Sequence, residues 1–231
     1  MTTATDTLRD RVQEAARALD GAPALEIVRW AVEATGGNIA VAGSMQDSVT
    51  SHLVSQVRPG VDVLFLDTGY HFRETLRMRD RVQGQLDVNV VDVLPKQTVA
   101  EQDAEYGPRL HDRDPGLCCF LRKVAPLAEA LAPYDAWVTG LRREESATRA
   151  NTPVVSWDDK HDMIKVCPLA TWTADDVENY QVEHGLLRNA LVLQGYSSIG
   201  CAPCTRRVDP GADPRSGRWA GTDKVECGIH I

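Results

Sequence analysis

The sequence predicts an α/β protein built on a doubly wound, mostly parallel sheet, and three observations support this prediction. Short apolar stretches of strand length alternate with longer stretches of helical periodicity between residues 38 and 184, an alternation typical of β-α-β units. The 231 residues are 43% hydrophobic and 25% charged, which suits one large domain with a sizeable core. No internal repeat or low-complexity tract interrupts the pattern.

The predicted elements follow one another in a regular order. Apolar residues at helical spacing predict a helix over residues 5–20, and Pro23 opens a second one that ends near Gly36 and Gly37. The predicted strands cover residues 38–42, 61–66, 87–93, 136–140 and 163–166. The helices predicted between and after them cover residues 48–57, 73–85, 123–132 and 175–184.

The polar turns after the first, second and fourth strands are the expected binding edge, because ligands of doubly wound sheets sit beyond the carboxyl ends of the strands. From about Tyr196 onward the periodic pattern is lost, and Gly, Pro, Arg and Cys dominate. We therefore expect an α/β domain over residues 1–195, followed by a functional segment over residues 196–231 rather than a second domain.

The charge balance limits the partners that the protein can bind. There are 25 Lys and Arg residues against 33 Asp and Glu residues, a net charge of −8. This argues against broad binding to nucleic acid or a membrane surface, but it leaves room for a small anionic ligand. No stretch approaches the roughly 18 apolar residues of a membrane span, and the first 20 residues lack the apolar run of a secretory signal. We expect a cytoplasmic protein.

Two pairs of cysteines, in stretches that look like loops, are candidate metal ligands. Cys118 is followed by Cys119, and Cys201 and Cys204 form a Cys-Ala-Pro-Cys motif. Together they can supply four thiolates to one centre, which would hold zinc or an iron–sulfur cluster; a set of free thiols is the alternative. Adjacent cysteines do not form the knuckle typical of structural zinc sites, which favours a [4Fe–4S] cluster without excluding zinc.

The other two cysteines differ in their surroundings. Cys167 lies in the apolar stretch 164–169, where a free cysteine acts as a small buried hydrophobic residue. Cys227 lies in a polar stretch beside Gly228. Chain ends are often mobile, so this position predicts a thiol that reacts in a site and is then presented to a second protein. A disordered tail that happens to contain a cysteine is the alternative.

Four motifs together resemble the assimilatory sulfonucleotide reductases, and among them the iron–sulfur adenylyl-sulfate (APS) reductases. They are Cys-Cys-Phe-Leu-Arg-Lys over 118–123, Cys-Ala-Pro-Cys-Thr-Arg over 201–206, Asp-Pro-Arg-Ser-Gly-Arg-Trp over 213–219 and Glu-Cys-Gly-Ile-His over 226–230. The resemblance implies an adenine nucleotide alpha hydrolase-like fold of the PP-loop type with a mobile C-terminal catalytic segment. It also implies that one [4Fe–4S] cluster is ligated by Cys118, Cys119, Cys201 and Cys204, and that Cys227 is the nucleophile.

The resemblance further implies a set of substrate-binding residues. The turn over 43–48 lacks the Ser-Gly-Gly-x-Asp-Ser loop of ATP pyrophosphatases but still offers polar groups to an anion. The expected ligands are Ser44, Asp47, Ser48, Leu66, Gly140, Arg149, Arg215 and Arg218. Lys123 is expected to lie between cluster and substrate and to couple their charges, unless it is a helix-surface lysine. His230 is expected to assist protonation or to hold the tail.

The implied reaction belongs to sulfate assimilation and cysteine biosynthesis. The Cys227 thiolate attacks the sulfur of APS, AMP leaves, and thioredoxin, a transient partner, releases sulfite from the S-sulfocysteine. Reduction of 3′-phosphoadenylyl sulfate (PAPS), or of both nucleotides, is the alternative. More distant alternatives are an iron–sulfur PP-loop tRNA sulfurtransferase and a zinc-stabilised adenine-nucleotide-binding module. The expected assembly leaves room for a homo-oligomer.

Overall fold

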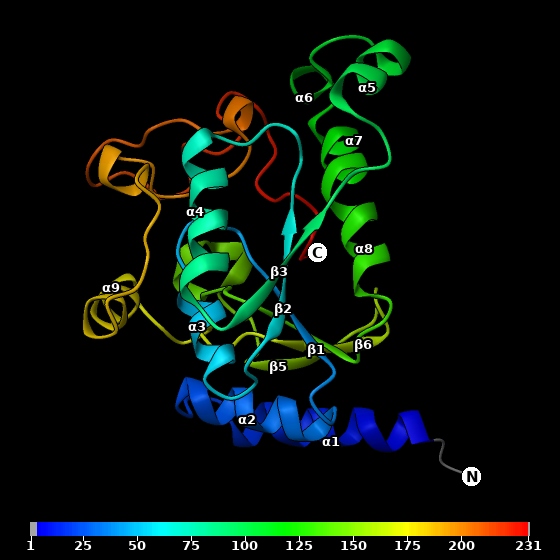
Figure 1. Ribbon diagram of the computed structural model, residues 1–231, viewed down its shortest axis with the longest axis vertical. Coiled ribbons are helices and arrows are strands. Elements are labelled where there is room, and N and C mark those ends of the chain that lie inside the picture. Colours follow the sequence, from blue (N-terminus) through cyan, green and yellow to red (C-terminus); the bar gives the residue numbers. More distant parts are fainter. Residues whose placement is uncertain (1–3, 231) are drawn as a thin grey trace.

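The computed structural model describes residues 4–230 and contains a six-stranded sheet (Figure 1). Its strands are β1 (Ile39–Ala42), β2 (Val61–Leu66), β3 (Val88–Val93), β4 (Ala136–Thr139), β5 (Val155–Asp158) and β6 (Met163–Val166). They lie in the order β3-β2-β1-β4-β6-β5. Every neighbouring pair is parallel except β5 and β6, which are antiparallel. The predicted mostly parallel sheet is therefore confirmed.

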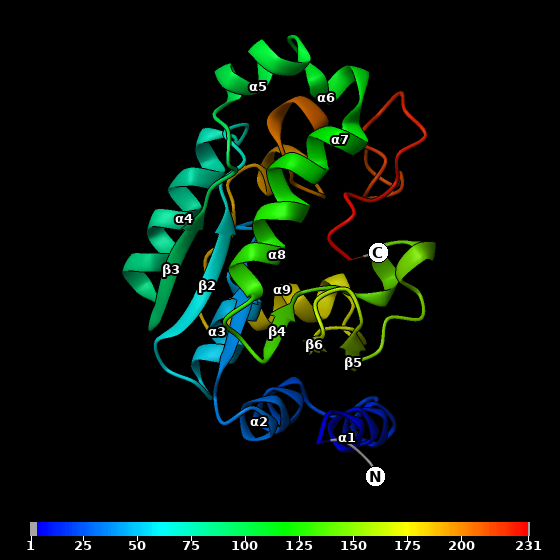
Figure 2. The ribbon, with the colours of Figure 1, turned by 90° about the vertical axis from the view of Figure 1, so that its right-hand side faces the viewer.

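Helices cover both faces of this sheet. They are α1 (Ala4–Ala18), α2 (Ala24–Ala34), α3 (Val49–Ser55), α4 (Arg73–Gln85), α5 (Val99–Tyr106), α6 (Leu110–Arg113), α7 (Pro115–Cys119), α8 (Ala125–Leu131) and α9 (Ala174–Glu183). Val28 of α2 and Val82 of α4 pack in the core on one face, whereas Leu127 and Leu131 of α8 pack on the other. Figure 2 shows α4 and α8 on opposite sides of β2 and β3.

The central strands alternate between these two cores. In β1, Ile39 and Val41 face the core that includes α2 and α4, and Ala40 faces the core that includes α8. Trp137 of β4 likewise faces the α8 side and is fully buried. Alternation is the geometry of a strand. Because both faces are buried, these strands are recognisable in the sequence as nearly continuous apolar runs.

The strand order creates a crevice at the carboxyl edge of the sheet. From β1 the chain builds β2 and β3 on one side, and it later returns to add β4 and β6 on the other. The loops that leave β1 and β4 therefore diverge, which is the usual ligand position in this architecture. The segment after residue 195 lies over this edge in Figures 1 and 2. It is held there partly by Ile199, whose amide donates to Gln46 Oε1 at 2.9 Å.

The structure differs from the sequence reading in several elements, and the helices α5 and α6 were not predicted. The edge strand β5 was not predicted, because its four residues carry only one apolar side chain that is fully buried. The region of Cys118 and Cys119 was expected to be a loop, but it forms α7, and one helical run extends from α7 through a π-helical turn (Phe120–Val124) into α8. Asp114 caps this run by accepting from the Leu117 amide at 2.8 Å, and Pro115 takes the first turn.

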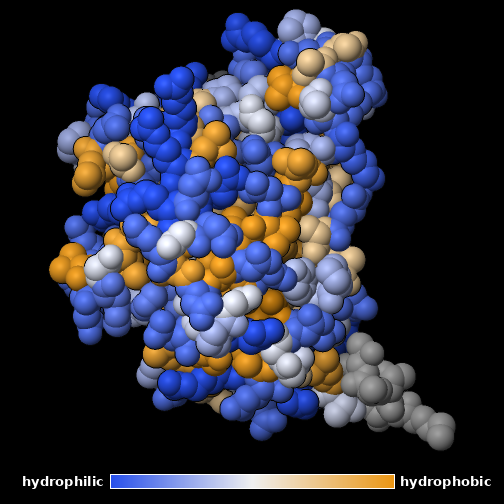
Figure 3. All heavy atoms as spheres, viewed as in Figure 1, coloured by the Kyte–Doolittle hydropathy of each residue, from blue (hydrophilic) through white to orange (hydrophobic). Residues whose placement is uncertain are grey.

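The surface seen in Figure 3 is mostly hydrophilic, with an apolar band between the positions of α4 and α8. No helix within residues 4–230 has both the length and the apolar content that a bilayer span requires. The boundary expected at residue 195 between a domain and a C-terminal segment stays a prediction.

The buried faces of the sheet predict where substitutions destabilise the fold. Ile164 in β6 is fully buried, so Ile164→Ala should lower the free energy of unfolding by about 2–5 kcal/mol through lost burial and an unfilled cavity. Urea denaturation measures this change. Val182→Ala is the control, because Val182 on α9 is 77% exposed, and it should cost less than about 0.5 kcal/mol. Equal losses from the two substitutions would contradict the burial pattern.

Candidate active site

Two cavities lie beside the C-terminal segment, and Lys123 lines both of them. The first, which we call the thiol cavity, is lined by Cys118, Cys119, Cys201 and Cys204. The second, which we call the switch-point cleft, is partly open to solvent and has a cavity volume of about 200 Å³. It is lined by parts of the segments 42–46, 64–66, 139–141, 198–200, 215–219 and 226–230. The loops after β1 and β4 and the end of β2 thus meet there, as predicted for a doubly wound sheet.

The thiol cavity joins cysteines that are more than 80 residues apart in the sequence. Cys118 and Cys119 come from α7, and Cys201 and Cys204 flank a short 3₁₀ turn (Ala202–Cys204). The turn is fixed by the Ala202 amide, which donates to the carbonyl oxygen of Tyr70 at 2.7 Å. The structure therefore brings together all four cysteines that the sequence singled out as ligands.

The thiols in this cavity disfavour each other's ionisation. Burial, and then the neighbouring thiols Cys119 and Cys201, raise the pKa of Cys118 to about 12. Burial and Cys201 raise the pKa of Cys204 to about 11. Cys201 differs, because Lys123 and a hydrogen bond with Thr68 (3.3 Å) outweigh its burial and lower its pKa. Crowded thiols of this kind become ligands when a metal cation compensates their charge.

The spacing of the four cysteine thiols is relevant to the kind of metal centre that they could hold. Among residues 4–230, no three His, Cys, Asp or Glu side chains converge closely enough to hold a single metal ion. The four cysteines nevertheless line one shared space. A single zinc ion needs its thiolates within about 2.3 Å of one point, whereas a polynuclear centre spreads its thiolates over several irons. Thiolates are the donors of both kinds of centre, so the chemistry of the four cysteines fits either one.

Lys123 is positioned by the π-helical turn that follows Cys119. A π turn inserts one extra residue per turn and is frequent at functional sites. Here it buries both Arg122 and Lys123, which disagrees with the alternative of a lysine on the helix surface. Burial opposes the charge of Lys123, but Cys201 and then Cys227 outweigh it and raise its pKa. No carboxylate of the described chain forms a salt bridge with it.

Of the polar residues in the loop after β1, only some line the cleft. Ser44 lines the cleft. Ser48 is fully buried below it and donates its hydroxyl to the carbonyl of Leu187 at 3.3 Å. Asp47 accepts from the Val49 amide at 3.0 Å, and burial raises its pKa. Neither Asp47 nor Ser48 contributes to the described cleft lining, so the expectation that both contact a ligand gains no support.

Leu66 and Gly140 both line the cleft. The carbonyl oxygen of Leu66 accepts from His71 Nε2 at 2.8 Å, and burial lowers the pKa of His71, which keeps the ring neutral. Gly140 has no room for a side chain, because a Cβ there would lie 2.6 Å from the Thr50 hydroxyl. The loop after β4 can therefore approach a ligand with its backbone.

Arg149 and Arg215 contact the C-terminal tail (Val225–His230). Arg149 donates from Nε and Nη2 to the two carboxylate oxygens of Glu226, each at 2.8 Å. Arg215 donates from Nη2 to the same carboxylate at 3.1 Å. Burial alone would raise the pKa of Glu226, but these two arginines outweigh it and lower the pKa. The sequence did not single out Glu226, although it stands in one of the quoted motifs.

Arg218 and Trp219 keep unused donors at the cleft. Arg218 Nε and Trp219 Nε1 are buried and have no hydrogen-bond partner in the described structure, and the Arg218 guanidinium stacks 4.4 Å from the centre of the Trp219 ring. Trp219 has a φ of 49°, which is strained for an aromatic residue. Buried orphan donors call for an acceptor, so an anionic ligand would satisfy both. Trp219 was not predicted, because its backbone conformation cannot be read from the sequence.

The tail brings Cys227 and His230 into the same cleft. The His230 ring stacks on Trp137 at 5.5 Å between ring centres and 4° between planes. Burial, then the charges of Lys165 and Arg149, lower the pKa of His230 well below its ordinary value. Its neutral ring and stacked geometry support a role in holding the tail.

Cys167 is 1% exposed and outside the cleft, which agrees with its predicted place in the core.

Comparisons with known proteins agree with this geometry. A family model described as "Phosphoadenosine phosphosulfate reductase domain" matches residues 37–207. The adenosine 5′-phosphosulfate reductase of Streptomyces coelicolor is 60% identical over 226 residues, which cover 98% of this chain and 96% of that protein. The adenosine 5′-phosphosulfate reductase of Mycolicibacterium smegmatis is 55% identical over 232 residues, which cover 100% of this chain and 98% of that protein.

Solved structures extend the likeness to the fold. The PAPS reductase of Candida auris, a phosphate complex, has a TM-score of 0.70 and 26% identity, and covers 84% of this chain and 96% of its own. The FMN adenylyltransferase of Candida glabrata with ATP has a TM-score of 0.58, covering 98% and 78%, but at 12% identity it shows the fold alone. The predicted PP-loop type of fold is confirmed. With a family model over most of its length and relatives that match it almost end to end, the chain belongs to the phosphoadenosine phosphosulfate reductase domain family.

Proposed function

We propose that this protein reduces adenylyl sulfate to sulfite and AMP, with Cys227 as the nucleophile and thioredoxin as the electron donor. One observation carries the proposal: the Cys227 thiol shares the switch-point cleft with four cationic side chains, at the edge of the sheet where this fold binds nucleotides. The names of the relatives, adenosine 5′-phosphosulfate reductase, support this substrate. A thiol-based reductant and a reduced thiol site suit the cytoplasm.

The proposed chemistry balances in two steps. The Cys227 thiolate forms a bond to the sulfur of APS, the bond from sulfur to the phosphate oxygen breaks, and AMP leaves. A thioredoxin thiolate then attacks Cys227 Sγ, the sulfur–sulfur bond breaks, and sulfite leaves with its electron pair. The second thioredoxin thiol resolves the mixed disulfide. Thioredoxin is thereby oxidised by two electrons, the sulfur is reduced by two, and the Cys227 thiol is regenerated.

The sulfate and phosphate of the substrate need cationic ligands, because their oxygens repel an incoming thiolate. Arg218 has a buried unpartnered Nε, and Lys123 has no carboxylate partner in the described chain. Within residues 4–230 the Arg215 side chain donates its hydrogen bonds from Nη2 alone. We assign Lys123 and Arg218 to the anion, with the remaining Nε and Nη1 donors of Arg215 beside them. Guanidinium groups are suited to this task through their paired donors.

The four cysteines of the thiol cavity are the proposed ligands of one [4Fe–4S] cluster. When bound, such a cluster supplies a fixed charge beside Lys123, and the thiols of Cys227 and thioredoxin account for both electrons. Lys123 lines both cavities, so its ammonium group can hold the substrate's anion at a position that responds to charge in the thiol cavity.

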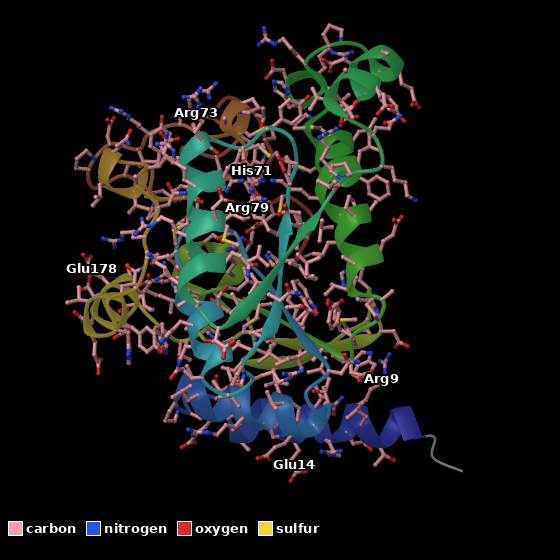
Figure 4. All side chains as sticks on the ribbon, viewed as in Figure 1. Arg9, Glu14, His71, Arg73, Arg79 and Glu178 are labelled. Carbon is pink, nitrogen blue, oxygen red and sulfur yellow. The ribbon has the colours of Figure 1, made fainter. Side chains whose placement is uncertain are left out.

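APS is the proposed substrate rather than PAPS, because the 3′-phosphate of PAPS needs additional cations near the ribose. Near the loop after β2, His71 lies inside the outline of the molecule and Arg73 at its edge (Figure 4). The structure adds Arg122, which the sequence did not indicate at this place. It is 3% exposed and donates to the Thr68 carbonyl at 2.5 Å and to Gln102 at 3.0 Å. Its donors are thus used inside the fold.

The first prediction concerns the cluster ligands. Cys201→Ser should abolish or cripple cluster retention, because a neutral hydroxyl is a poor ligand for iron. Iron and acid-labile sulfide, assayed on anaerobically purified protein, measure the loss. Cys167→Ser is the matched control and should keep the cluster, since Cys167 is buried outside the thiol cavity. Full iron and sulfide in the Cys201 variant, or zinc in the wild type, would refute the assignment.

The second prediction concerns the nucleophile. With APS and no thioredoxin, the wild type should gain one SO₃ group on the peptide that contains Cys227, and thioredoxin should remove it. Intact-protein and peptide mass spectrometry follow both events. Cys227→Ser should keep cluster and nucleotide binding but make no sulfite, because an alcohol is a far weaker nucleophile than a thiolate. An adduct on Cys167, or sulfite from the Cys227 variant, would sink this mechanism.

The third prediction concerns specificity. Thioredoxin-dependent sulfite production should show a higher kcat/KM for APS than for PAPS, since neither Arg73 nor Arg122, the arginines near the loop after β2, lines the described cleft. Assays with each nucleotide under identical conditions decide this point. Equal or better turnover of PAPS would overturn the substrate assignment while leaving the mechanism intact. Sulfite from neither nucleotide would favour another PP-loop activity, such as tRNA sulfur transfer.

A further inference from the structure

We propose that Glu226 is the positioning residue that seats Cys227 in the cleft, through an ion pair with Arg149 and Arg215. The inference rests on the proposed function in one respect, namely that Cys227 is the reacting thiol. It assigns Arg149 to the tail rather than to the substrate. Glu226 directly precedes Cys227, so fixing its carboxylate fixes the backbone that carries the thiol.

The geometry of the ion pair is that of a specific docking contact. Glu226 receives two parallel hydrogen bonds of 2.8 Å from Arg149, one of 3.1 Å from Arg215 and one of 3.3 Å from the Thr148 hydroxyl. Bidentate pairs between arginine and carboxylate are strong and orientation-dependent. Arg149 is itself aimed by Glu145, which accepts from Nη1 at 2.5 Å. The direction of the tail is therefore set by contacts to both partners of the ion pair, Glu226 and Arg149.

The other polar contacts of the tail within residues 4–230 go to its backbone. Arg215 donates to the Val225 carbonyl at 3.1 Å, Lys160 donates to the Gly228 carbonyl at 2.7 Å, and Lys165 lies 3.5 Å from the His230 carbonyl. Carbonyl contacts hold the path of a chain but tolerate a shift along it. Glu226 supplies the side-chain ion pair of the tail, immediately beside Cys227, and thereby sets the register.

Burial makes this pair costly to open. The side chains of Glu226, Arg149 and Arg215 are 5%, 12% and 13% exposed. Arg149 and Arg215 repel one another, and burial, followed by the charge of Arg149, lowers the pKa of Arg215. If Glu226 left or lost its charge, Arg215 would lose its carboxylate partner and Arg149 would keep only Glu145, which is unfavourable for buried cations. The arginines therefore favour the docked tail.

While the tail stays docked, the cleft keeps enough unpaired positive charge to bind the anionic substrate. Lys123, Arg149, Arg215 and Arg218 line the cleft, and so do the carboxylates of Glu145 and Glu226. This leaves two positive charges, the number needed by one phosphate and one sulfate group. Lys123 and Arg218 have no carboxylate partner in the described chain, so the anion and Glu226 need not compete for the same guanidinium face.

The experiment compares the wild type with Glu226→Gln, Arg149→Gln and the double variant. The matched control is Glu144→Gln, because Glu144 pairs with Arg142 and does not contact the tail. Three readouts are taken: the rate of iodoacetamide alkylation at Cys227, the rate of SO₃ transfer from APS in single turnover, and the APS dissociation constant. The last is measured for each variant in the unreactive Cys227→Ser background.

Glu226→Gln should raise the alkylation rate of Cys227 and lower the rate of SO₃ transfer, each on the order of tenfold to a hundredfold, as expected for the loss of charged hydrogen bonds. The APS dissociation constant should change less than about threefold, because the anion has its own cations. Arg149→Gln should act in the same way, and the double variant should be no worse than the poorer single variant, as for residues that act as one unit. Glu144→Gln should match the wild type.

Any one of three results would overturn the proposal. Unchanged alkylation of Cys227 in Glu226→Gln would show that the carboxylate does not hold the tail. Markedly tighter APS binding in that variant, or much weaker binding in Arg149→Gln, would show that Glu226 and the substrate compete for Arg149. If Cys227 accepts no SO₃ even in the wild type, the proposed function fails, and the alkylation and binding measurements still decide the docking role.

Discussion

Buried positive charge at the carboxyl edge of the sheet is the constraint on which the rest of this site depends. Lys123, Arg149, Arg215 and Arg218 all line one cleft, and cations in a low-dielectric site must have counter-charges. Among the described residues, only some of these four cations are paired with a carboxylate. Glu145 and Glu226 neutralise the arginines that face the tail, whereas Lys123 and Arg218 are left facing the cleft without a carboxylate among the described residues. An anionic substrate is then favoured by the same electrostatics that hold the tail closed.

The sheet determines where that charge can accumulate. The central strands are mostly buried on both faces, and only Lys165 of β6 places a cation on a strand of the described sheet. The loops at the carboxyl ends of the strands are therefore the main positions for positive charge. The π-helical turn after Cys119 directs Lys123 inward from one side, and the loop after β4 carries Arg149 on the other. The C-terminal segment closes the cleft and contributes Arg215 and Arg218. The site is thus assembled from segments that are distant in the sequence but converge at a topological switch point.

The strands were predictable from the sequence because burial on both faces produces apolar runs, as in β1 and β2, and all five predicted strands are present. The short edge strand β5 and the helices α5, α6 and α7 were missed, since none of them has a long periodic pattern. The cysteine pairs were recognisable from their spacing, and the structure brings them together. The roles of Glu226 and Trp219 were not recognisable. The first depends on a contact 77 residues away along the chain, and the second on a backbone conformation, neither of which has a local signal in the sequence.

The contrast between Cys167 and Cys227 shows why position decides what a thiol can do. Cys167 has Lys165 and Arg149 within electrostatic reach, yet burial dominates and raises its pKa to about 12. A nearby positive charge is therefore not sufficient to activate a cysteine when the surrounding core excludes water and ligands. Cys227 is only partly buried and lines the cleft itself. Its backbone is fixed by neighbours on both sides, Glu226 through the arginines and Gly228 through Lys160. A thiol held by its neighbours rather than by its own packing remains available to react, which a core position such as that of Cys167 does not permit.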